Sequence, residues 1–260
     1  MTGGISVVKI VTINNVKGGV AKTTTATNLA AGLARKGKRV LLIDSDPQAN
    51  ASSNLHPGLK ADRTIKDLFQ GTPITEIISP SVEAGLDIIP SCLAFSTIEL
   101  ELAAQLARET VLKRALKPIQ DHYDVILIDT QPSVGVIPIN ALCAANEVII
   151  PVHEAYALDA MSQMVSIILQ VKQTLNPDLA IGGILLTMYD TRTTLAKEVR
   201  DRLLDKFGTI VFETTIPRNI RLAECPTHKK SIFEYAPESA GAGAYQALTE
   251  EVMKRWGMVL

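Results

Sequence analysis

The residues with the clearest chemistry in this sequence form the stretch NNVKGGVAKTTTATNLA, residues 14–30. An apolar run of strand length precedes it and an amphipathic helical pattern follows, which is the setting of a phosphate-binding glycine loop. Gly18 and Gly19 allow a tight turn. The Lys22 ammonium would reach the β and γ phosphates, and the Thr23 hydroxyl would help to hold Mg²⁺. This context predicts a nucleoside-triphosphate site rather than an ordinary glycine turn with a surface lysine.

Three carboxylates follow two other strand-like runs. Asp44 and Asp46 end VLLIDSD, and Asp129 ends DVILID. Ligands of α/β sheets collect at the carboxyl ends of strands, so we expect all three at the edge that carries the loop. An acid at the end of VILID can hold Mg²⁺ through water, and Asp46 on its turn can orient the attacking water. Asp44 is equally well explained as a turn or helix cap.

Strand-like and helical patterns alternate along the chain. The expected strands are ISVVKIVTI, RVLLID, LDIIPS, YDVILIDT, EVIIPV, AIGGILLTMY and TIVFETTI, and the expected helices span residues 23–35, 98–116, 135–145, 157–175, 195–207 and 242–256. Several strands are apolar at consecutive positions, which is typical of parallel strands covered on both faces. We predict one doubly wound α/β domain over residues 1–260, with a mostly parallel sheet and helices on both faces. NLHPGLKADR is either a mobile loop or a plain surface connection.

The bulk composition excludes several classes of protein. The 260 residues carry a net charge of −1, so any contact with DNA or an anionic membrane needs a local basic patch. Three widely spaced cysteines suit a reducing cytosol better than a disulfide framework. We find neither a secretory signal nor an apolar run long enough to cross a bilayer, and we expect a soluble, cytoplasmic protein.

Three motifs in order resemble those of a known family. KGGVAKTT, DSDPQ and VILIDTQPS look like the deviant Walker A, Walker A′ and Walker B motifs of the ParA/MinD class of P-loop ATPases. The resemblance covers nearly the whole chain, and NALCAANEVIIPV, LLTMYDTRTTLAKEV and FETTIPRNIRLAECPTHKKSIFEY look like the chromosomal ParA (Soj) branch. Departures are Val16 and Ala21 in the loop, and Thr130 with Gln131 after the Walker B acid. Ala21 adds only one methyl group, so we expect nucleotide binding to survive.

This resemblance implies roles for individual residues and ATP with Mg²⁺ as cofactors. Lys17 would be the signature lysine that crosses a dimer interface to the ATP of the partner copy. The residues implied to act in catalysis are Lys17, Lys22 and Asp46. Those implied to bind the metal are Thr23, Asp46 and Asp129. Those implied to bind the nucleotide are Lys17, Gly18, Gly19, Val20, Ala21, Lys22, Thr23 and Thr24, with Met188, Pro217 and Asn219 bordering the adenine.

A basic stretch lies between residues 192 and 230. It holds nine basic and five acidic residues, so its local charge is positive although the chain is nearly neutral. Such a patch can bind DNA phosphates without reading bases, or it can be a solvated face with pairs such as Lys197 and Asp201. The resemblance implies nonspecific DNA binding through this portion, and we select Arg192, Arg218 and Arg221.

The function implied is that of a partition ATPase. It would dimerise on ATP, bind double-stranded DNA over the nucleoid, and be released when a ParB-like partner stimulates slow hydrolysis, driving chromosome or plasmid segregation. One alternative is an ATPase that positions a protein cargo over the nucleoid. Others are a MinD-like membrane regulator, which would need an insertable C-terminal helix that LTEEVMKRWGMVL does not resemble, and a noncatalytic DNA-binding regulator.

Overall fold

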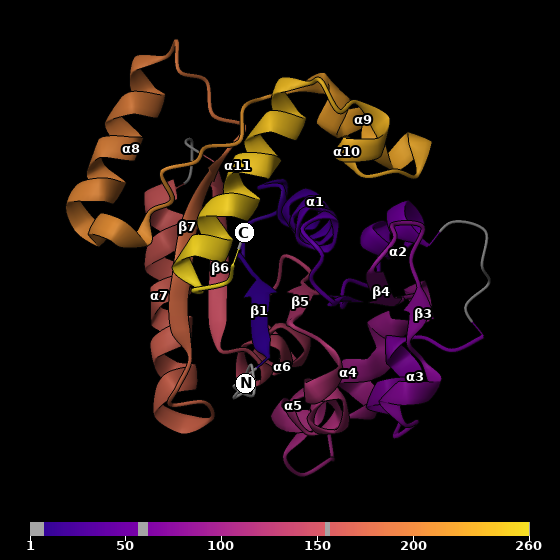
Figure 1. The fold of residues 1–260 in the computed structure, drawn as a ribbon. Helices are drawn as coiled ribbons and strands as arrows, with labels where there is room; N and C mark the ends of the chain where they lie inside the picture. The colour runs from indigo at the N-terminus through magenta and orange to yellow at the C-terminus, as the bar shows by residue number, and fades with distance from the viewer. Residues whose placement is uncertain (1–7, 57–61, 154–156, 260) are drawn as a thin grey trace, which may run out of the picture.

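A parallel sheet runs through the middle of the computed structural model, which describes residues 8–56, 62–153 and 157–259 (Figure 1). Its strands are β1 Lys9–Ile13, β2 Val40–Asp44, β3 Ser79–Pro80, β4 Leu86–Ile89, β5 Val125–Asp129, β6 Glu147–His153 and β7 Ala180–Thr187. They lie in the order β3-β4-β2-β5-β1-β6-β7, and only the short edge strand β3 is antiparallel to its neighbour. The prediction of a doubly wound, mostly parallel sheet is confirmed.

The inner strands are buried on both faces. In β5, Ile126 and Ile128 join the apolar cluster on one face of the sheet, whereas Val125 and Leu127 join the cluster on the other. Neither face meets water, so the run VILID needs no polar residue at alternate positions. This double burial is why the strands could be recognised from continuous apolar runs.

The helices form a layer on each face of the sheet (Figure 1). Their bounds are α1 Lys22–Arg35, α2 Asn50–Leu55, α3 Ile65–Phe69, α4 Ile98–Glu101, α5 Val111–Leu116, α6 Val136–Ala144, α7 Ala157–Thr174, α8 Thr194–Phe207, α9 Ile220–His228, α10 Ile232–Tyr235 and α11 Ala240–Arg255. One layer contains α1, α2, α9, α10 and α11, and the other contains α3 to α7. Helix α8 packs beside α7 at the β7 edge.

The helix predicted over residues 98–116 is wrong. This segment forms α4 and α5, which are separated by an irregular stretch and a short 3-10 turn. Ala107 has a left-handed φ of 54°, which interrupts a right-handed helix. Leu100 and Leu106 are 81% and 91% exposed, so the apolar residues here do not form one core-facing stripe.

The strand predicted for TIVFETTI, residues 209–216, is also wrong. The segment runs along β7, and the backbone N–H groups of Phe212 and Ile216 donate to β7 carbonyls at 2.9 Å. Glu213 and Thr214 instead donate their N–H groups to the Glu251 carboxylate of α11, at 2.9 Å each. The regular ladder of an eighth strand is therefore replaced by isolated bridges.

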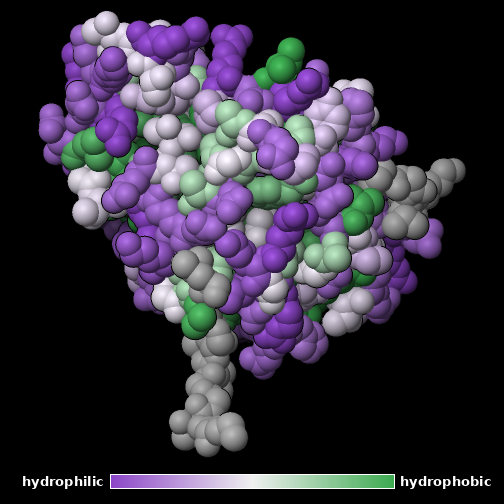
Figure 2. Space-filling view, turned by 45° about the horizontal axis from the view of Figure 1, so that its top comes forward, coloured by the Kyte–Doolittle hydropathy of each residue, from purple (hydrophilic) through white to green (hydrophobic). Residues whose placement is uncertain are grey.

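The remaining differences concern short elements. Helices α2, α3, α9 and α10 were not predicted, because segments of four to nine residues are too short to show a clear period. Residues 57–61 of the loop NLHPGLKADR lie outside the described residues. Among the described residues, no helix has the length and apolarity to cross a bilayer. Figure 2 brings the upper end of the view in Figure 1 forward and shows polar side chains over most of that face.

Candidate nucleotide site

The predicted phosphate loop connects β1 to α1 at the carboxyl edge of the sheet (Figure 1). Gly19 has φ 72° and Ala21, directly before the helix, has φ 61°. The backbone of position 21 is thus in the left-handed region that glycine adopts freely and alanine adopts at a cost of about 1–2 kcal/mol. No side chain of the described residues caps α1, so its first-turn N–H groups can serve an anion.

Lys22 lies inside this loop. The residue is 6% exposed, and its Nζ donates to the Lys17 carbonyl oxygen at 2.8 Å. Burial lowers the pKa of the Lys22 ammonium, while the nearby Asp129 and Asp46 carboxylates act in the opposite direction. The backbone N–H of Lys17 in turn donates to Asn15 Oδ1 at 3.0 Å. The cation therefore stands between the loop backbone and the acids.

The sheet brings the three predicted carboxylates together. β2 and β5 are parallel neighbours, and their register sets Asp44 opposite Asp129. Both are fully buried, and Asp46, two residues beyond β2, is 7% exposed. The convergence of the acids at the edge that carries the loop is therefore as expected.

Asp129 is the group that most needs a cation. Neither of its buried carboxylate oxygens has a hydrogen-bond partner within the described residues. Burial, and then the Asp44 carboxylate, raise the pKa of Asp129 well above its ordinary value. The nearby Thr23 side chain opposes this shift, although the pair falls short of hydrogen-bond geometry. A buried, unpaired carboxylate is costly unless a proton or metal ion compensates its charge.

The donor set fits magnesium bound together with phosphate. Mg²⁺ takes hard oxygen ligands, usually one or two carboxylates with phosphate oxygens and water. Thr23 and Asp129 supply such oxygens beside Lys22. No cluster of three or more metal-ligating side chains occurs in the described part of the chain, so the protein supplies only part of a coordination shell. The metal roles of Thr23, Asp46 and Asp129 stay predictions.

Asp44 is held as an internal acceptor. Its Oδ2 accepts from the backbone N–H of Ser52 at 2.8 Å and from Ser52 Oγ at 2.6 Å, and its Oδ1 accepts from the Asp46 N–H at 3.1 Å. Burial raises the pKa of Asp44 to about 6. Because it caps the first turn of α2, the cap interpretation is the one that the structure favours.

A cavity of about 630 Å³ opens in front of these groups. It is lined by Gly19, Ala21, Lys22, Thr23, Thr24, Asp46, Pro47, Gln48, Asn50, Ser96, Gln131, Pro132 and Ser133. Sequence reasoning missed six lining residues that lie within four positions after Asp46 or Asp129: Pro47, Gln48, Asn50, Gln131, Pro132 and Ser133. It also missed Ser96, which comes seven residues after β4 and carries no local signal.

Of the residues predicted to border the adenine, Met188 directly follows a strand end that contacts the loop. At the end of β7, the Thr187 hydroxyl lies within donating distance of two carbonyl oxygens, that of Val20 at 3.2 Å and that of Val152 at 3.1 Å. Met188 follows with φ 53°, and Pro217 pairs with Tyr189. Asn219 caps α9 by accepting from the Arg221 N–H at 2.9 Å. None of Met188, Pro217 and Asn219 lines the cavity above, so their contact with adenine stays a prediction.

The three selected arginines fall into two groups. The Arg192 guanidinium donates two hydrogen bonds to the Asp190 carboxylate, at 2.9 and 2.7 Å, and the Arg192 backbone N–H donates a third at 3.0 Å. These bonds and the nearby Arg218 lower the pKa of Asp190 to about 2, with the Arg192 bonds the larger cause. Arg221 instead pairs with Glu224 at 3.0 Å in α9. Within the described residues no ion pair joins Lys197 to Asp201, so that example of a solvated pair is not found.

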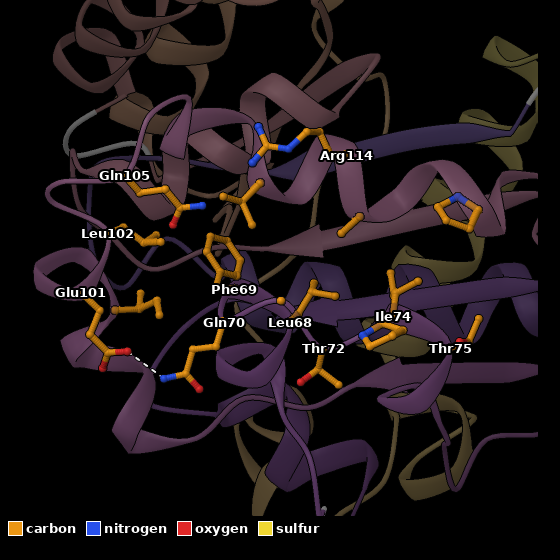
Figure 3. A pocket seen from close by; sticks show the side chains of 16 residues that line it. Leu68, Phe69, Gln70, Thr72, Ile74, Thr75, Glu101, Leu102, Gln105 and Arg114 are labelled. Atoms are coloured by element: carbon orange, nitrogen blue, oxygen red, sulfur yellow. Dashed lines mark hydrogen bonds between the residues drawn. The ribbon is translucent and has the colours of Figure 1, made fainter.

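A second cavity, of about 650 Å³, lies between α3, α4 and α5 (Figure 3). Phe69 and Leu102 in its lining are each 3% exposed and belong to the apolar core. Its acid, Glu101, is neutralised by Lys66 at 2.9 Å. It has no phosphate loop and no unpaired buried charge, which makes the first cavity the candidate site.

These features define a class of protein. A glycine loop between a central strand and a helix, with a buried lysine and acids at the carboxyl edge of a parallel sheet, is the site of a P-loop nucleoside triphosphatase. A family model described as an AAA domain matches residues 8–181.

Curated relatives narrow the class. The chromosome partitioning protein ParA of Myxococcus xanthus is 45% identical over 97% of this chain and 90% of its own length. The sporulation initiation inhibitor protein Soj of Bacillus subtilis is 46% identical over 94% of this chain and 98% of its own length. The chain belongs to the ParA/Soj family of chromosome-partitioning P-loop ATPases.

Solved structures share the fold. Cobyrinic acid a,c-diamide synthase from Mycobacterium smegmatis, with a bound ATP analogue and magnesium, is 33% identical with a TM-score of 0.84, covering 96% of both chains. The cell division ATPase MinD of Pyrococcus furiosus is 24% identical with a TM-score of 0.77, covering 95% of this chain and 98% of its own.

The left-handed alanine of the loop gives a test of backbone strain. Replacing Ala21 with glycine should stabilise the protein by about 1 kcal/mol, because glycine adopts positive φ without the clash of a Cβ. Urea unfolding measures the change. Ala107→Gly, at φ 54° far from the loop in sequence, should also stabilise, whereas Ala223→Gly on the exposed side of α9 should destabilise by about 1 kcal/mol. A loss of stability in Ala21→Gly would contradict the strain.

The buried Asp129 gives a test of charge. Its folded-state pKa lies above its unfolded value, so folded protein binds more protons in that window and stability falls as pH rises from about 4. Asp129→Asn cannot ionise, so at pH 8 and without nucleotide it should be more stable than the parent by about 1 kcal/mol or more. At pH 4.5 this advantage should shrink. The exposed control Asp205→Asn should show neither effect in urea unfolding, and a variant less stable than the parent at pH 8 would refute this account.

Proposed function

We propose that this chain is an ATP-driven switch for DNA partition. It binds ATP with Mg²⁺, dimerises through the nucleotide, binds DNA without reading its sequence, and leaves DNA when a ParB-like partner stimulates hydrolysis. The observation that carries the proposal is a cavity lined by Lys22 and Asp46 beside an uncapped helix N-terminus, with Asp129 buried close to Lys22 and without a hydrogen-bond partner among the described residues. A site built in this way favours a bound cation and phosphates over an empty state.

The loop residues then have defined roles. The Lys22 ammonium would exchange the Lys17 carbonyl for β and γ phosphate oxygens, and the N–H groups of α1 would bind the same anion. Asp46 is held at the cavity by the Gln48 N–H, which donates to its Oδ1 at 2.9 Å, and it would orient the attacking water. When bound, Mg²⁺ would offset the charge of the phosphates and of Asp129.

Lys17 would connect two copies of the chain. Its backbone is fixed at both ends, by Asn15 at the N–H and by Lys22 at the carbonyl. Gly18 and Gly19, directly after it, are exposed, so this part of the loop is accessible to a second molecule. We propose that Lys17 contacts the phosphates bound by the partner copy, so that loss of the γ phosphate loosens the dimer.

The arginines of the 192–230 portion would bind DNA phosphates. Arg192 and Arg218 both lie close to Asp190, and exposed ion pairs of this kind are weak and screened by salt. A duplex with its dense phosphate charge can therefore compete with Asp190. Two copies in a dimer would double the cationic surface, which would explain nucleotide-dependent DNA binding and place the protein on the nucleoid.

The direct test is the size and DNA retention of the purified protein with ATP, ADP and no nucleotide. We expect a dimer that retains nonspecific duplex DNA with ATP only, and Lys22→Ala should lose both properties. Lys38→Ala, at the opposite edge of the sheet and with its Nζ on the Val259 carbonyl, is the matched control and should keep them.

Three outcomes would change the proposal. If Lys22→Ala retains DNA as well as the parent does, nucleotide does not control DNA binding. If the parent binds ATP yet stays a monomer, even when Asp46→Ala blocks turnover, the role of Lys17 is wrong. An ATP-dependent pull-down that recovers a cargo protein instead of a ParB-like partner would favour the positioning of that cargo.

The Asp190 contact predicts a gain of function. Asp190→Asn removes a carboxylate that competes with phosphate for Arg192 and Arg218, so DNA affinity with ATP should rise about threefold and its salt dependence should steepen. Fluorescence anisotropy at several salt concentrations measures both. Asp201→Asn on α8 also removes one negative charge, but Asp201 forms no ion pair among the described residues. This variant should therefore have the smaller effect. Equal effects would show that only total charge matters.

A further inference from the structure

Ser52, on α2, joins three segments of the carboxyl edge through one hydroxyl group. Its Oγ donates to Asp44 Oδ2 at 2.6 Å and accepts from the Ser91 backbone N–H at 2.8 Å. The Ser52 N–H also donates to the same Asp44 oxygen at 2.8 Å. The residue is 7% exposed, so water cannot readily replace these bonds. The end of β2, helix α2 and the segment after β4 are thus fastened at one point.

On one side, the hydrogen bonds of Ser52 lead through Asp44 to Asp46, which lines the nucleotide cavity. The Asp44 carboxylate binds Ser52 with one oxygen and the Asp46 N–H with the other, at 3.1 Å. The Asp46 carbonyl then accepts from the Ala49 N–H at 2.9 Å, which closes the turn before α2. The position of Asp46 in the cavity therefore depends on a buried carboxylate whose orientation Ser52 sets.

On the other side, the hydrogen bond between Ser52 and Ser91 leads to the segment that contains Ser96, which also lines the cavity. Ser91 begins the segment after β4 that continues into the 3-10 turn Leu93–Thr97. Ser96 of this turn lines the nucleotide cavity together with Asp46. Ser52 does not line the cavity itself, yet both of its hydroxyl contacts lead to residues that do.

We propose that Ser52 is a positioning residue for ATP hydrolysis. It fixes the Asp46 turn and the Ser96 segment relative to each other without touching the nucleotide. Removing its hydroxyl takes the acceptor from the Ser91 N–H and leaves Asp44 with only the backbone N–H groups of Ser52 and Asp46, so the two segments are no longer joined through one side chain. The inference rests on the proposed function, in which Asp46 orients the attacking water.

The test compares turnover with nucleotide affinity in the full chain. Ser52→Ala should lower kcat about 10- to 100-fold while KM and the Kd for an ATP analogue stay within about threefold of the parent. Ser52→Thr keeps the hydroxyl and should recover most of kcat. Ser53→Ala, the exposed neighbour on the same helix, is the matched control and should behave as the parent does.

The alternatives give different patterns. A Ser52→Ala variant with kcat within about twofold of the parent would overturn the proposal. So would a parallel loss of kcat, affinity and thermal stability that Ser52→Thr does not rescue, because that is the pattern of a merely structural residue. If Ser52→Ala does not fold, Ser52→Cys, with a weaker donor of similar size, is judged by the same criteria. A folded parent that binds ATP and never hydrolyses it would refute the proposed function first, and this inference with it.

Discussion

The site depends on an unfavourable gathering of charge. Asp44, Asp46 and Asp129 crowd behind one lysine, and two of these carboxylates are fully buried. Asp44 can be accommodated because three hydrogen-bond donors face it, whereas neither carboxylate oxygen of Asp129 has a hydrogen-bond partner among the described residues. The ionised Asp129 carboxylate therefore carries an uncompensated buried charge, which destabilises the fold and which a bound cation can neutralise. This charge couples metal and nucleotide binding to the stability of the fold, since whatever binds the folded site stabilises it.

The sheet creates this crowding through its strand order. β5 lies between β1 and β2 in the sheet. Asp129, at the end of β5, therefore lies between the end of β1, where the phosphate loop begins, and Asp44 at the end of β2. Helices cover both faces, so the carboxyl edge is where loops from several strands can meet a ligand. Burial of the strands and the shift of the pKa values are thus two consequences of one architecture.

The sequence predicts those features that short-range patterns encode. The runs VLLID and VILID could be predicted as strands because strands buried on both faces are continuously apolar. The phosphate site could be predicted because the residues of its glycine loop are close together in sequence. The segments 98–116 and 209–216 were wrong for a different reason. In the first segment, the left-handed φ of Ala107 interrupts a run whose apolar spacing resembles a helix. In the second, two backbone N–H groups of a strand-like run donate to the Glu251 carboxylate, which lies 38 and 37 residues away in sequence. Ser96 reaches the cavity only through the folding of β4 beside β2.

Short hydroxyl side chains hold the loops of this edge together, and this view explains one departure from the family pattern. Thr130, one of the departures from the motif that the chain resembles, donates its hydroxyl to the Ile13 carbonyl at 2.9 Å and so joins the end of β5 to the end of β1. Thr187 reaches the Val20 carbonyl from β7, and Ser52 links β2 to β4. These bonds join different segments of the carboxyl edge: two strand ends at Thr130, a strand end and the phosphate loop at Thr187, and helix α2 with two segments at Ser52. For Thr130 and Ser52, which do not contact the phosphate loop, we expect a substitution to change turnover more than affinity, because the loop backbone and Lys22 keep their contacts.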